Sequence, residues 1–575
     1  MSEQAGTRDG VIEHRNMEFQ LGRYDEAVRR RLKRWQEEGF GRRLWARDPT
    51  LWAPQPLPEL TDRLGWLTLP ENLPAEIEAL TRFGDEIRQE GFRDAVVLGM
   101  GGSSLAPEVY AHMFGHAPGY PTLSVLDTTH PAAVRAVAGR LDLARTLFVV
   151  SSKSGSTTEM MSLFRAFWDL TGRALDRQPG SQFVAVTDPG SGLEKLAKER
   201  GFRAVFNAQP DVGGRYSAFT PFGLVPAALI GANLRSLADS GRSMAAACAP
   251  GVPATENPGL CLGAALGELA LAGRDKVTFL TTPAAAPFPD WIEQLIAEST
   301  GKRKVSGDGH AGIVPVVGEP AGPPEAYGDD RFFVALLLGR DGEAEVLDRI
   351  AALRQAGHPV ACFRLDSATD LGREIFRWEV AVAAAGAVIG VHPFDQPDVQ
   401  LAKELATQAM QNAGGTSAQP DRRETPAADP AALRKALHGW LQGTRPGDYL
   451  GVHAYLPPAA DTTETLRELQ GALRDGTRLA TTLGYGPRFL HSTGQLHKGG
   501  PDKGRFLQIV DDPAEDMAVP ETNFTFGELI RAQAEGDRQA LEQRGRKVLR
   551  VQLGSGGSGD ALAALLAAAR EAAGR

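Results

Sequence analysis

The segment Phe148-Val149-Val150-Ser151-Ser152-Lys153-Ser154-Gly155-Ser156-Thr157-Thr158-Glu159 decides the fold class of this chain. It begins with a short apolar run rich in β-branched residues, which is typical of a buried strand. Apolar residues then recur at helical spacing: Met160, Leu163, Phe164, Phe167 and Leu170. Ser156 and Glu159 have the spacing of a capping box, which predicts the start of this helix. The segment is therefore predicted to form a strand, a loop and a helix in immediate succession.

The loop between this strand and this helix, Ser152–Thr157, is a candidate phosphate-binding site. Free backbone N–H groups and the positive end of the helix dipole meet at a helix N-terminus. The hydroxyl groups of Ser152, Ser154 and Thr157 add neutral donors, and Lys153 can add charge. The loop lacks the lysine spacing of a P-loop. An ordinary Ser/Thr-rich turn with a good helix cap is the alternative interpretation.

Length and composition indicate a globular protein of several domains. The chain has 575 residues, of which 42% are hydrophobic and 23% are charged, and this is too long for one hydrophobic core. The net charge of −9 argues against a nucleic-acid partner, because no broad basic surface is supplied. Cys248, Cys261 and Cys362 have no CxxC spacing, so we expect neither a disulfide framework nor a zinc site.

The N-terminus, Met1–Arg15, lacks the apolar core of a signal peptide. The most apolar stretches, such as Phe219–Leu234, are interrupted by Pro and Gly and fall short of the ~18 residues that a membrane span needs. We therefore expect a soluble cytoplasmic protein without a membrane partner.

Strand and helix patterns alternate on both sides of the opening segment, which predicts doubly wound parallel sheets with ligands at the carboxyl ends of their strands. In the C-terminal part we expect strands at 449–456, 505–510 and 548–553 and helices at 431–442, 465–483 and 560–572. The predicted organisation is an N-terminal helical apron (1–90), a first α/β domain (91–260), a second α/β domain (261–411), a linker or mobile loop (412–430) and a C-terminal α/β extension (431–575).

The first glycine-rich loop, Gly99–Ser104, partly fits the dinucleotide-binding fingerprint. Gly99 and Gly101 match it, and Asp127 at the end of the next strand stands where a ribose-binding acid would. Ser104 occupies the place of the third glycine, and an incomplete fingerprint is weak evidence. The alternative is that Gly102 and Ser103 approach a sugar from this loop.

Four further segments are relevant to the function of this chain. Gly213-Gly214-Arg215 can bring a fixed cation close to a ligand, or can be a turn with a surface Arg. Glu298 lies on the apolar face of a helix, where a carboxylate is either paired structurally or held with a raised pKa for proton transfer. His491 and His497, close to Lys498 in a polar segment, suit ligand contact or proton transfer; a solvated loop is the other interpretation. The fourth segment is Phe394-Asp395-Gln396, followed seven residues later by Lys403.

Together these segments resemble the glucose-6-phosphate isomerase family, whose members contain two sugar-isomerase-type α/β domains. The resemblance covers most of the chain from about Ala95 onward. The chain is similar to the isomerase half of bacterial transaldolase–isomerase fusion proteins, and it carries no transaldolase signature. With the segments predicted above, the resemblance implies an α/β fold of two sugar-isomerase-type domains, with doubly wound parallel sheets and N-terminal and C-terminal helical additions.

The resemblance implies roles for individual residues of this chain. The catalytic residues would be Glu298, His491, Lys403 and Arg215. Together with Lys153 of the loop described above, the substrate-binding residues would be Gly102, Ser103, Ser152, Ser154, Thr157 and Gln396. In the family the histidine segment precedes the Phe-Asp-Gln motif, whereas here His491 follows it by about ninety residues. His497 is the competing candidate, although Gln495 gives only His491 the family's spacing.

The activity implied by the resemblance is reversible aldose–ketose isomerisation of glucose 6-phosphate and fructose 6-phosphate. His491 and Lys403 would open the sugar ring, and Glu298 would move a proton between C2 and C1. Arg215 would stabilise the cis-enediolate intermediate. No metal or other cofactor is implied, and the family's dimeric state makes a homodimer the expectation.

Three alternative functions are kept open. The first is an isomerase with broader specificity that includes mannose 6-phosphate. The second is a non-catalytic phosphosugar-binding protein, which would need neither Glu298 nor His491. The third is an NAD-dependent oxidoreductase, against which the missing third glycine counts.

Overall fold

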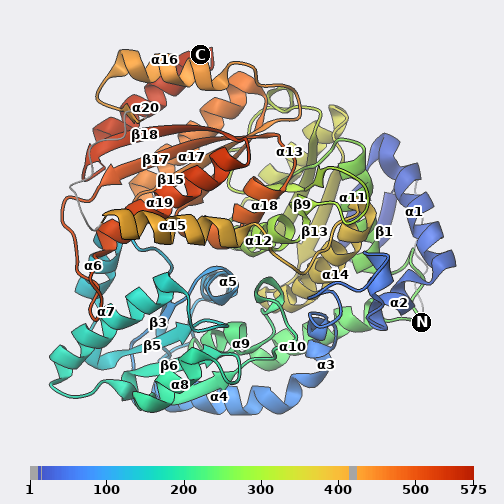
Figure 1. Ribbon diagram of the computed structural model, residues 1–575. Helices are drawn as coiled ribbons and strands as arrows, with labels where there is room; N and C mark the ends of the chain where they lie inside the picture. The colour runs from blue at the N-terminus through green and yellow to red at the C-terminus, as the bar shows by residue number, and fades with distance from the viewer. Residues whose placement is uncertain (1–10, 15, 414–423, 558, 575) are drawn as a thin grey trace.

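The computed structural model describes residues 11–14, 16–413, 424–557 and 559–574 (Figure 1). Within these residues the longer strands form three sheets, each the centre of one α/β unit. In Figure 1 the first unit lies at the bottom, the second at the right and the third at the upper left. The predicted α/β class with parallel sheets is confirmed.

The first sheet is entirely parallel and has the order β4 (Thr122–Leu126), β3 (Asp94–Leu98), β5 (Thr146–Ser151), β6 (Phe183–Thr187) and β7 (Ala204–Asn207). Every residue of β5 is buried, as expected for a central strand covered by helices on both faces. The β-branched run of the opening segment is thus the middle strand of this sheet.

Helices cover both faces of the first sheet. They are α4 (Pro74–Gln89), α5 (Leu105–Phe114), α6 (Pro131–Arg140), α7 (Thr158–Leu175), α8 (Gly192–Glu199) and α9 (Pro221–Leu229). The apolar stripe of α7 packs on the sheet, where Phe164 and Phe167 join Phe148 and Phe183 in one buried cluster. The helical spacing of these residues in the sequence has this packing as its physical cause.

The second sheet has a parallel core of β11 (Val314–Val316), β8 (Lys276–Thr281), β12 (Arg331–Leu338) and β13 (Val360–Leu365). Its helices include α10 (Leu234–Ala247), α11 (Pro258–Leu271), α12 (Phe288–Thr300), α13 (Glu343–Gln355) and α14 (Leu371–Ile389). Helix α12 carries Glu298 near its C-terminal end.

Two N-terminal strands extend the second sheet, which corrects the prediction of a purely helical apron over residues 1–90. The strands β1 (Val11–His14) and β2 (Met17–Gln20) form an antiparallel hairpin, and β2 pairs antiparallel with β13. Met17 and Phe19 are buried. The apron also contains helices, among them α1 (Asp25–Glu38) and α4. The hairpin was missed because a four-residue alternation is too short to stand out in a polar segment.

A third parallel sheet occupies the C-terminal part, so the addition there is a complete α/β unit rather than helices alone. Its order is β14 (Thr425–Pro426), β18 (Lys547–Ser555), β17 (Gly504–Asp512), β15 (Tyr449–Tyr455) and β16 (Ala480–Tyr485). Its helices are α16 (Pro430–Leu441), α17 (Ala460–Thr477), α18 (Gly494–Gly499), α19 (Phe526–Gln543) and α20 (Gly559–Ala572).

The helix predicted over 465–483 is wrong in its last part. Helix α17 ends at Thr477, where Arg478 adopts a left-handed conformation with φ 63°. The following residues form β16, which pairs in parallel with β15. The predicted linker 412–430 lies largely outside the described residues, because 414–423 are not among them.

The three units share one winding order. With the two-residue edge strand β14 left aside, the first strand of the parallel set in each sheet lies between the second and the third: β4-β3-β5, β11-β8-β12 and β16-β15-β17. The loops that follow the strands at such a reversal point diverge and leave room for a ligand. In the first sheet these are the loops after β3 and β5, which carry the predicted sugar and phosphate contacts.

The third unit packs against the other two through a few helices and loops. Helix α15 (Val399–Ala413) leaves the second unit and packs along α19 of the third (Figure 1). Helix α18 contacts α12. Among the helices in the described part of the chain, none has the length and apolar character needed to span a bilayer.

Candidate active site

The loop Ser152–Thr157 joins β5 to the N-terminus of α7, as predicted from the sequence. Hydrogen bonds between residues of the loop fix its conformation. The Ser152 hydroxyl accepts the N–H of Gly155 at 3.1 Å, and the Ser154 hydroxyl accepts the N–H of Ser156 at 3.3 Å. Gly155 has φ 73°, a conformation that favours glycine. The loop is therefore held in shape over the start of the helix, with Ser154 exposed.

The capping box predicted for Ser156 and Glu159 is absent. Thr157 is the N-cap residue and its side chain makes no capping hydrogen bond, while the Ser156 hydroxyl bonds that of Ser154. The Glu159 carboxylate turns instead toward the third unit, where tertiary partners replace the local one. The local sequence pattern could not reveal these partners.

Lys153 is already occupied by protein partners. Its ammonium lies 2.8 Å from an Asp188 carboxylate oxygen and donates to the carbonyls of Pro210 and Val212. These bonds tie the loop to the chain that leads to Arg215, so this geometry gives Lys153 a role in arranging the loop.

The glycine loop after β3 lies against two other site segments. A Cβ atom on Gly102 would lie 2.1 Å from the carbonyl oxygen of Gly214. One on Gly101, which has φ 56°, would lie 2.4 Å from the carbonyl oxygen of His491. Only glycine permits both approaches. Ser103 is half-buried in the same short turn.

Asp127, the acid considered for ribose binding, is paired within the protein. Its carboxylate accepts a hydrogen bond from the Ser104 hydroxyl at 3.1 Å and lies 3.4 Å from Nε of Arg488. The residue at the third-glycine position thus orients this carboxylate.

Arg215 is the centre of the site and is 2% exposed. Its guanidinium donates from Nε to the Ser299 hydroxyl at 2.8 Å and from Nη1 to Gln396 Oε1 at 2.9 Å. Nη2 donates to the backbone carbonyls of Pro393 and Asp395 at 2.7 and 3.0 Å. This fork of bonds fixes the cation rigidly against the Phe394-Asp395-Gln396 loop, as a guanidinium can.

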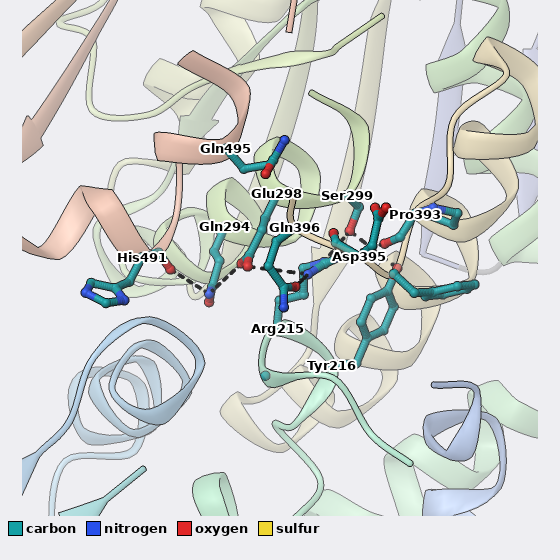
Figure 2. Close-up of polar contacts among 12 residues, drawn as sticks. Arg215, Tyr216, Gln294, Glu298, Ser299, Pro393, Asp395, Gln396, His491 and Gln495 are labelled. Atoms are coloured by element: carbon teal, nitrogen blue, oxygen red, sulfur yellow. Dashed lines mark hydrogen bonds and ion pairs between the residues drawn. The ribbon is translucent and has the colours of Figure 1, made fainter. Parts of the chain in front are cut away.

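Glu298 connects Arg215 to the histidine segment (Figure 2). One carboxylate oxygen lies 3.4 Å from Nη1 of Arg215, and the other accepts from Nε2 of Gln294 at 2.9 Å. The same Gln294 nitrogen donates to the carbonyl oxygen of His491 at 2.9 Å. Glu298 is 9% exposed. The helix face on which it lies is therefore buried, and its carboxylate is held by Arg215 and Gln294.

The His491 imidazole points away from Glu298 (Figure 2). Its Nε2 lies 2.9 Å from Oε1 of Glu159. Burial raises the pKa of Glu159, but the His491 contact and the charge of Lys403 outweigh this and lower that pKa to about 2. Glu159 is therefore an anion, so Nε2 of His491 carries the proton and donates it.

The two remaining candidates on the Phe-Asp-Gln side are also placed near this cluster. Gln396 bonds Arg215 directly. Lys403 lies in the second turn of α15, where it is exposed, and its charge acts on Glu159. The structure thus places both Glu298 and Gln396 against Arg215. Lys403 is connected to this cluster through the effect of its charge on Glu159.

The two histidines considered from the sequence lie in different surroundings. Gln495, one turn after His491, donates to the carbonyl of Gly301 and accepts the N–H of Asp398. It thereby ties the histidine segment to the end of α12 and the start of α15. His497 is buried against Phe506 and its Nδ1 bonds the Tyr449 hydroxyl at 3.0 Å. Burial lowers the pKa of His497, as for a residue of the third unit's core.

Several residues of the cluster were not singled out from the sequence. Gln294 could have been found, because it stands one helical turn before Glu298 on α12. Lys302 donates to the carbonyls of His392 and Asp395 and to the Asp395 carboxylate. Burial, with Arg215 nearby, lowers the pKa of Lys302 to about 7. No local signal pointed to the contact between Glu159 and His491.

The chain is similar to proteins of one known family. The phosphoglucose isomerase family matches residues 83–318. Glucose-6-phosphate isomerase of Rubrobacter xylanophilus is 31% identical over 399 residues, which are 62% of this chain and 91% of that protein. The enzyme of Nostoc punctiforme is 29% identical over 415 residues, which are 64% of this chain and 74% of that protein.

Two solved structures have the same fold over most of their length. A hypothetical protein from Thermus thermophilus superposes with a TM-score of 0.59 at 26% identity, covering 68% of this chain and 97% of that one. A glucose-6-phosphate isomerase from Chlamydia trachomatis superposes with a TM-score of 0.55 at 20% identity, covering 71% and 90%.

The parallel sheets, with polar loops at the carboxyl ends of their strands, place the chain in the class of sugar-isomerase-type α/β proteins. Within that class the chain belongs to the glucose-6-phosphate isomerase family. The matched residues 83–318 contain the loop Ser152–Thr157, Arg215 and Glu298. Gln396, Lys403 and His491 lie beyond them.

Proposed function

We propose that the chain catalyses the reversible isomerisation of glucose 6-phosphate and fructose 6-phosphate. The observation that carries the proposal is the buried Glu298 carboxylate, held between Gln294 and Arg215. Membership of the family supplies the reaction, since relatives that align over most of their length are glucose-6-phosphate isomerases.

The proposed phosphate site is the loop Ser152–Thr157. This proposal is supported by the position of the loop at the N-terminus of α7, where backbone N–H groups and the helix dipole attract an anion. Ser152, Ser154 and Thr157 would donate from their hydroxyls. Gly102 and Ser103, in the neighbouring loop after β3, would contact the sugar. Binding of the remote phosphate would hold the reacting carbons in place and lower the barrier.

Glu298 is the proposed base of the isomerisation step. It would take the proton from C2 of the open-chain aldose, and the electron pair of that C–H bond would form the C1–C2 double bond of a cis-enediolate. The π electrons of the C1 carbonyl would move to O1, and the proton of the C2 hydroxyl would pass to O1. Returning the abstracted proton to C1, as the C2 carbonyl forms, would complete the ketose. Arg215, whose charged group lies 3.4 Å from Glu298, would stabilise the negative charge of the intermediate.

His491 and Lys403 are the proposed ring-opening groups. With the Nε2 proton of His491 engaged by Glu159, Nδ1 is the nitrogen available to exchange a proton with the sugar. Two sugar oxygens exchange protons in ring opening, the ring oxygen and the anomeric hydroxyl oxygen. His491 would exchange a proton with one of them, and Lys403, whose charge acts on the Glu159 carboxylate, would exchange a proton with the other. Ring opening must come first, because the carbonyl makes the C2–H acidic.

We also propose a cytoplasmic location and a sugar phosphate as the small-molecule partner. The net charge of −9 supports the absence of a nucleic-acid partner, and no metal or other cofactor enters the proposed steps. A homodimer is proposed from the family resemblance. The contacts described above all lie within one chain. Light scattering, which measures the mass of the particle in solution, tests the proposed homodimer.

One assay tests the proposed function. Purified protein is supplied with fructose 6-phosphate and no added metal, and glucose 6-phosphate is detected by a coupled dehydrogenase. Steady formation of glucose 6-phosphate is the expected result. A parallel reaction with mannose 6-phosphate measures the breadth of specificity. Binding of fructose 6-phosphate without turnover would favour the non-catalytic alternative.

A further inference from the structure

A buried glutamine from the third unit reaches the Glu159–His491 pair. Gln533 lies on α19 and is 4% exposed. Its Nε2 donates to Oε1 of Glu159 at 2.8 Å, and its Oε1 accepts the Thr129 hydroxyl at 2.6 Å. The same Glu159 oxygen accepts from Nε2 of His491. One carboxylate oxygen is thus shared between the histidine and this glutamine.

The Thr129 contact determines which way the amide faces. A glutamine side chain has one accepting and one donating end. Because the Thr129 hydroxyl donates to Oε1, the NH₂ group of Gln533 is directed to Glu159. Three groups therefore act in sequence: the hydroxyl orients the amide, the amide holds the carboxylate, and the carboxylate orients the imidazole.

We propose that Gln533 is a positioning residue for catalysis, holding Glu159 so that the His491 imidazole keeps its proton on Nε2 and presents Nδ1 to the substrate. This inference rests on the proposed role of His491. Gln533 itself would not touch the sugar.

The neighbouring contacts distinguish positioning from mere attachment of the third unit. His130, next to Thr129, pairs with Asp511 through Nε2 and Oδ1 at 3.1 Å. Helix α19 begins with a capping box of Thr525 and Glu528. The interface and the helix therefore have other supports, and removing one amide donor should leave both in place.

The physical effect of the amide is on the charge of Glu159. A hydrogen bond from a neutral donor stabilises the carboxylate anion and fixes its orientation. Without it the carboxylate could turn away from Nε2 of His491, and the imidazole would lose the contact that selects its tautomer. The other charged groups near the pair are Lys403 on α15, and Asp127 and Arg488 beside His491.

The test compares three variants. Gln533→Met keeps the side-chain length and removes the donor. Thr129→Val keeps the shape and removes the orienting hydroxyl. Gln539→Met is the matched control on the same helix, because the Gln539 amide donates to Glu535 of that helix and has no part in the proposed positioning. Circular dichroism and thermal melts first establish that each variant folds.

We expect Gln533→Met to lower kcat by ~10-fold or more, as for loss of a hydrogen bond to a charged group, with KM changed by less than about 2-fold. Thr129→Val should lower kcat in the same way but by a smaller factor. Wild-type kcat in a folded Gln533→Met variant would overturn the proposal.

A second readout does not depend on activity. Nitrogen-15 spectra of histidine-labelled protein report the tautomer of His491. The signals of His491 are identified because they are missing from the spectrum of His491→Gln. We expect the Nε2-protonated tautomer in the wild type and a mixture of the two neutral tautomers in Gln533→Met. An unchanged tautomer in that variant would refute the positioning role of Gln533. An inactive wild type would instead refute the proposed function. If Gln533→Met does not fold, Thr129→Val decides by the same measurements.

Discussion

Replacing Glu298 by Gln isolates the proposed base with little change of shape. The amide oxygen of the new side chain can still accept the hydrogen bond from Gln294, which Glu298 now receives at 2.9 Å. The ion pair with Arg215 at 3.4 Å is lost. Arg215 keeps four hydrogen bonds to other groups, so we expect a stability loss of no more than about 1.5–3 kcal/mol, the scale of one hydrogen bond to a charged group.

Turnover should fall sharply even though the protein stays folded. An amide cannot accept the C2 proton, and loss of a general base typically costs ~10²–10⁴-fold in rate. We expect kcat of Glu298→Gln to fall at least ~10²-fold, equivalent to about 2.7 kcal/mol in the barrier. Binding of the sugar phosphate, measured by calorimetry, should change little, because the phosphate loop is untouched.

The coupled assay on fructose 6-phosphate measures kcat, and Glu293→Gln is the matched control. Glu293 lies on the same helix but lines a separate cavity of ≈ 230 Å³ together with Glu108 and Asp290. Its variant should retain kcat within about 2-fold, the scale of a substitution outside the chemistry. Turnover of Glu298→Gln near that of the wild type would remove Glu298 from the mechanism.

Two other variants test neighbouring parts of the proposal, and the control variant Glu293→Gln tests the environment of that carboxyl group. Arg215→Lys keeps the charge but cannot reproduce the guanidinium fork, so kcat/KM should fall by ~10²-fold in steady-state kinetics; an unchanged value would contradict its role at the enediolate. Ser154→Ala combined with Thr157→Ala should weaken binding of inorganic phosphate by ~1.5–3 kcal/mol per lost bond at nearly unchanged Tm, and unaltered affinity in calorimetry would reject the loop. Burial raises the pKa of Glu293 to about 8, so the folded state holds this proton more tightly than the unfolded chain and the Glu293 contribution to stability decreases as pH rises from ~4.5 to 8. The Tm of Glu293→Gln relative to wild type should therefore rise across that range, and a constant difference would show that the carboxyl is not perturbed.

Local pattern was enough for much of the fold and for the candidate residues on the second unit. The β-branched run before Ser152 and the apolar spacing after it each depend on neighbours within one element, so they predicted β5 and α7 correctly. Glu298 was chosen because an acid on an apolar helix face is visible in the sequence. Its nearest partner, Gln294, is also local.

The tertiary structure alone decided the partners that come from distant parts of the chain. The Glu159 spacing favours a helix cap, but its carboxylate bonds His491 and Gln533, 332 and 374 residues away. The hairpin β1–β2 acquires its place only by pairing with β13. Secondary structure follows from periodicity along the chain, whereas a buried polar group takes whichever partner the packing of whole units brings within hydrogen-bond distance. That is why the sequence pointed to His491 as a candidate, and only the packing of the third unit on the first showed what orients it.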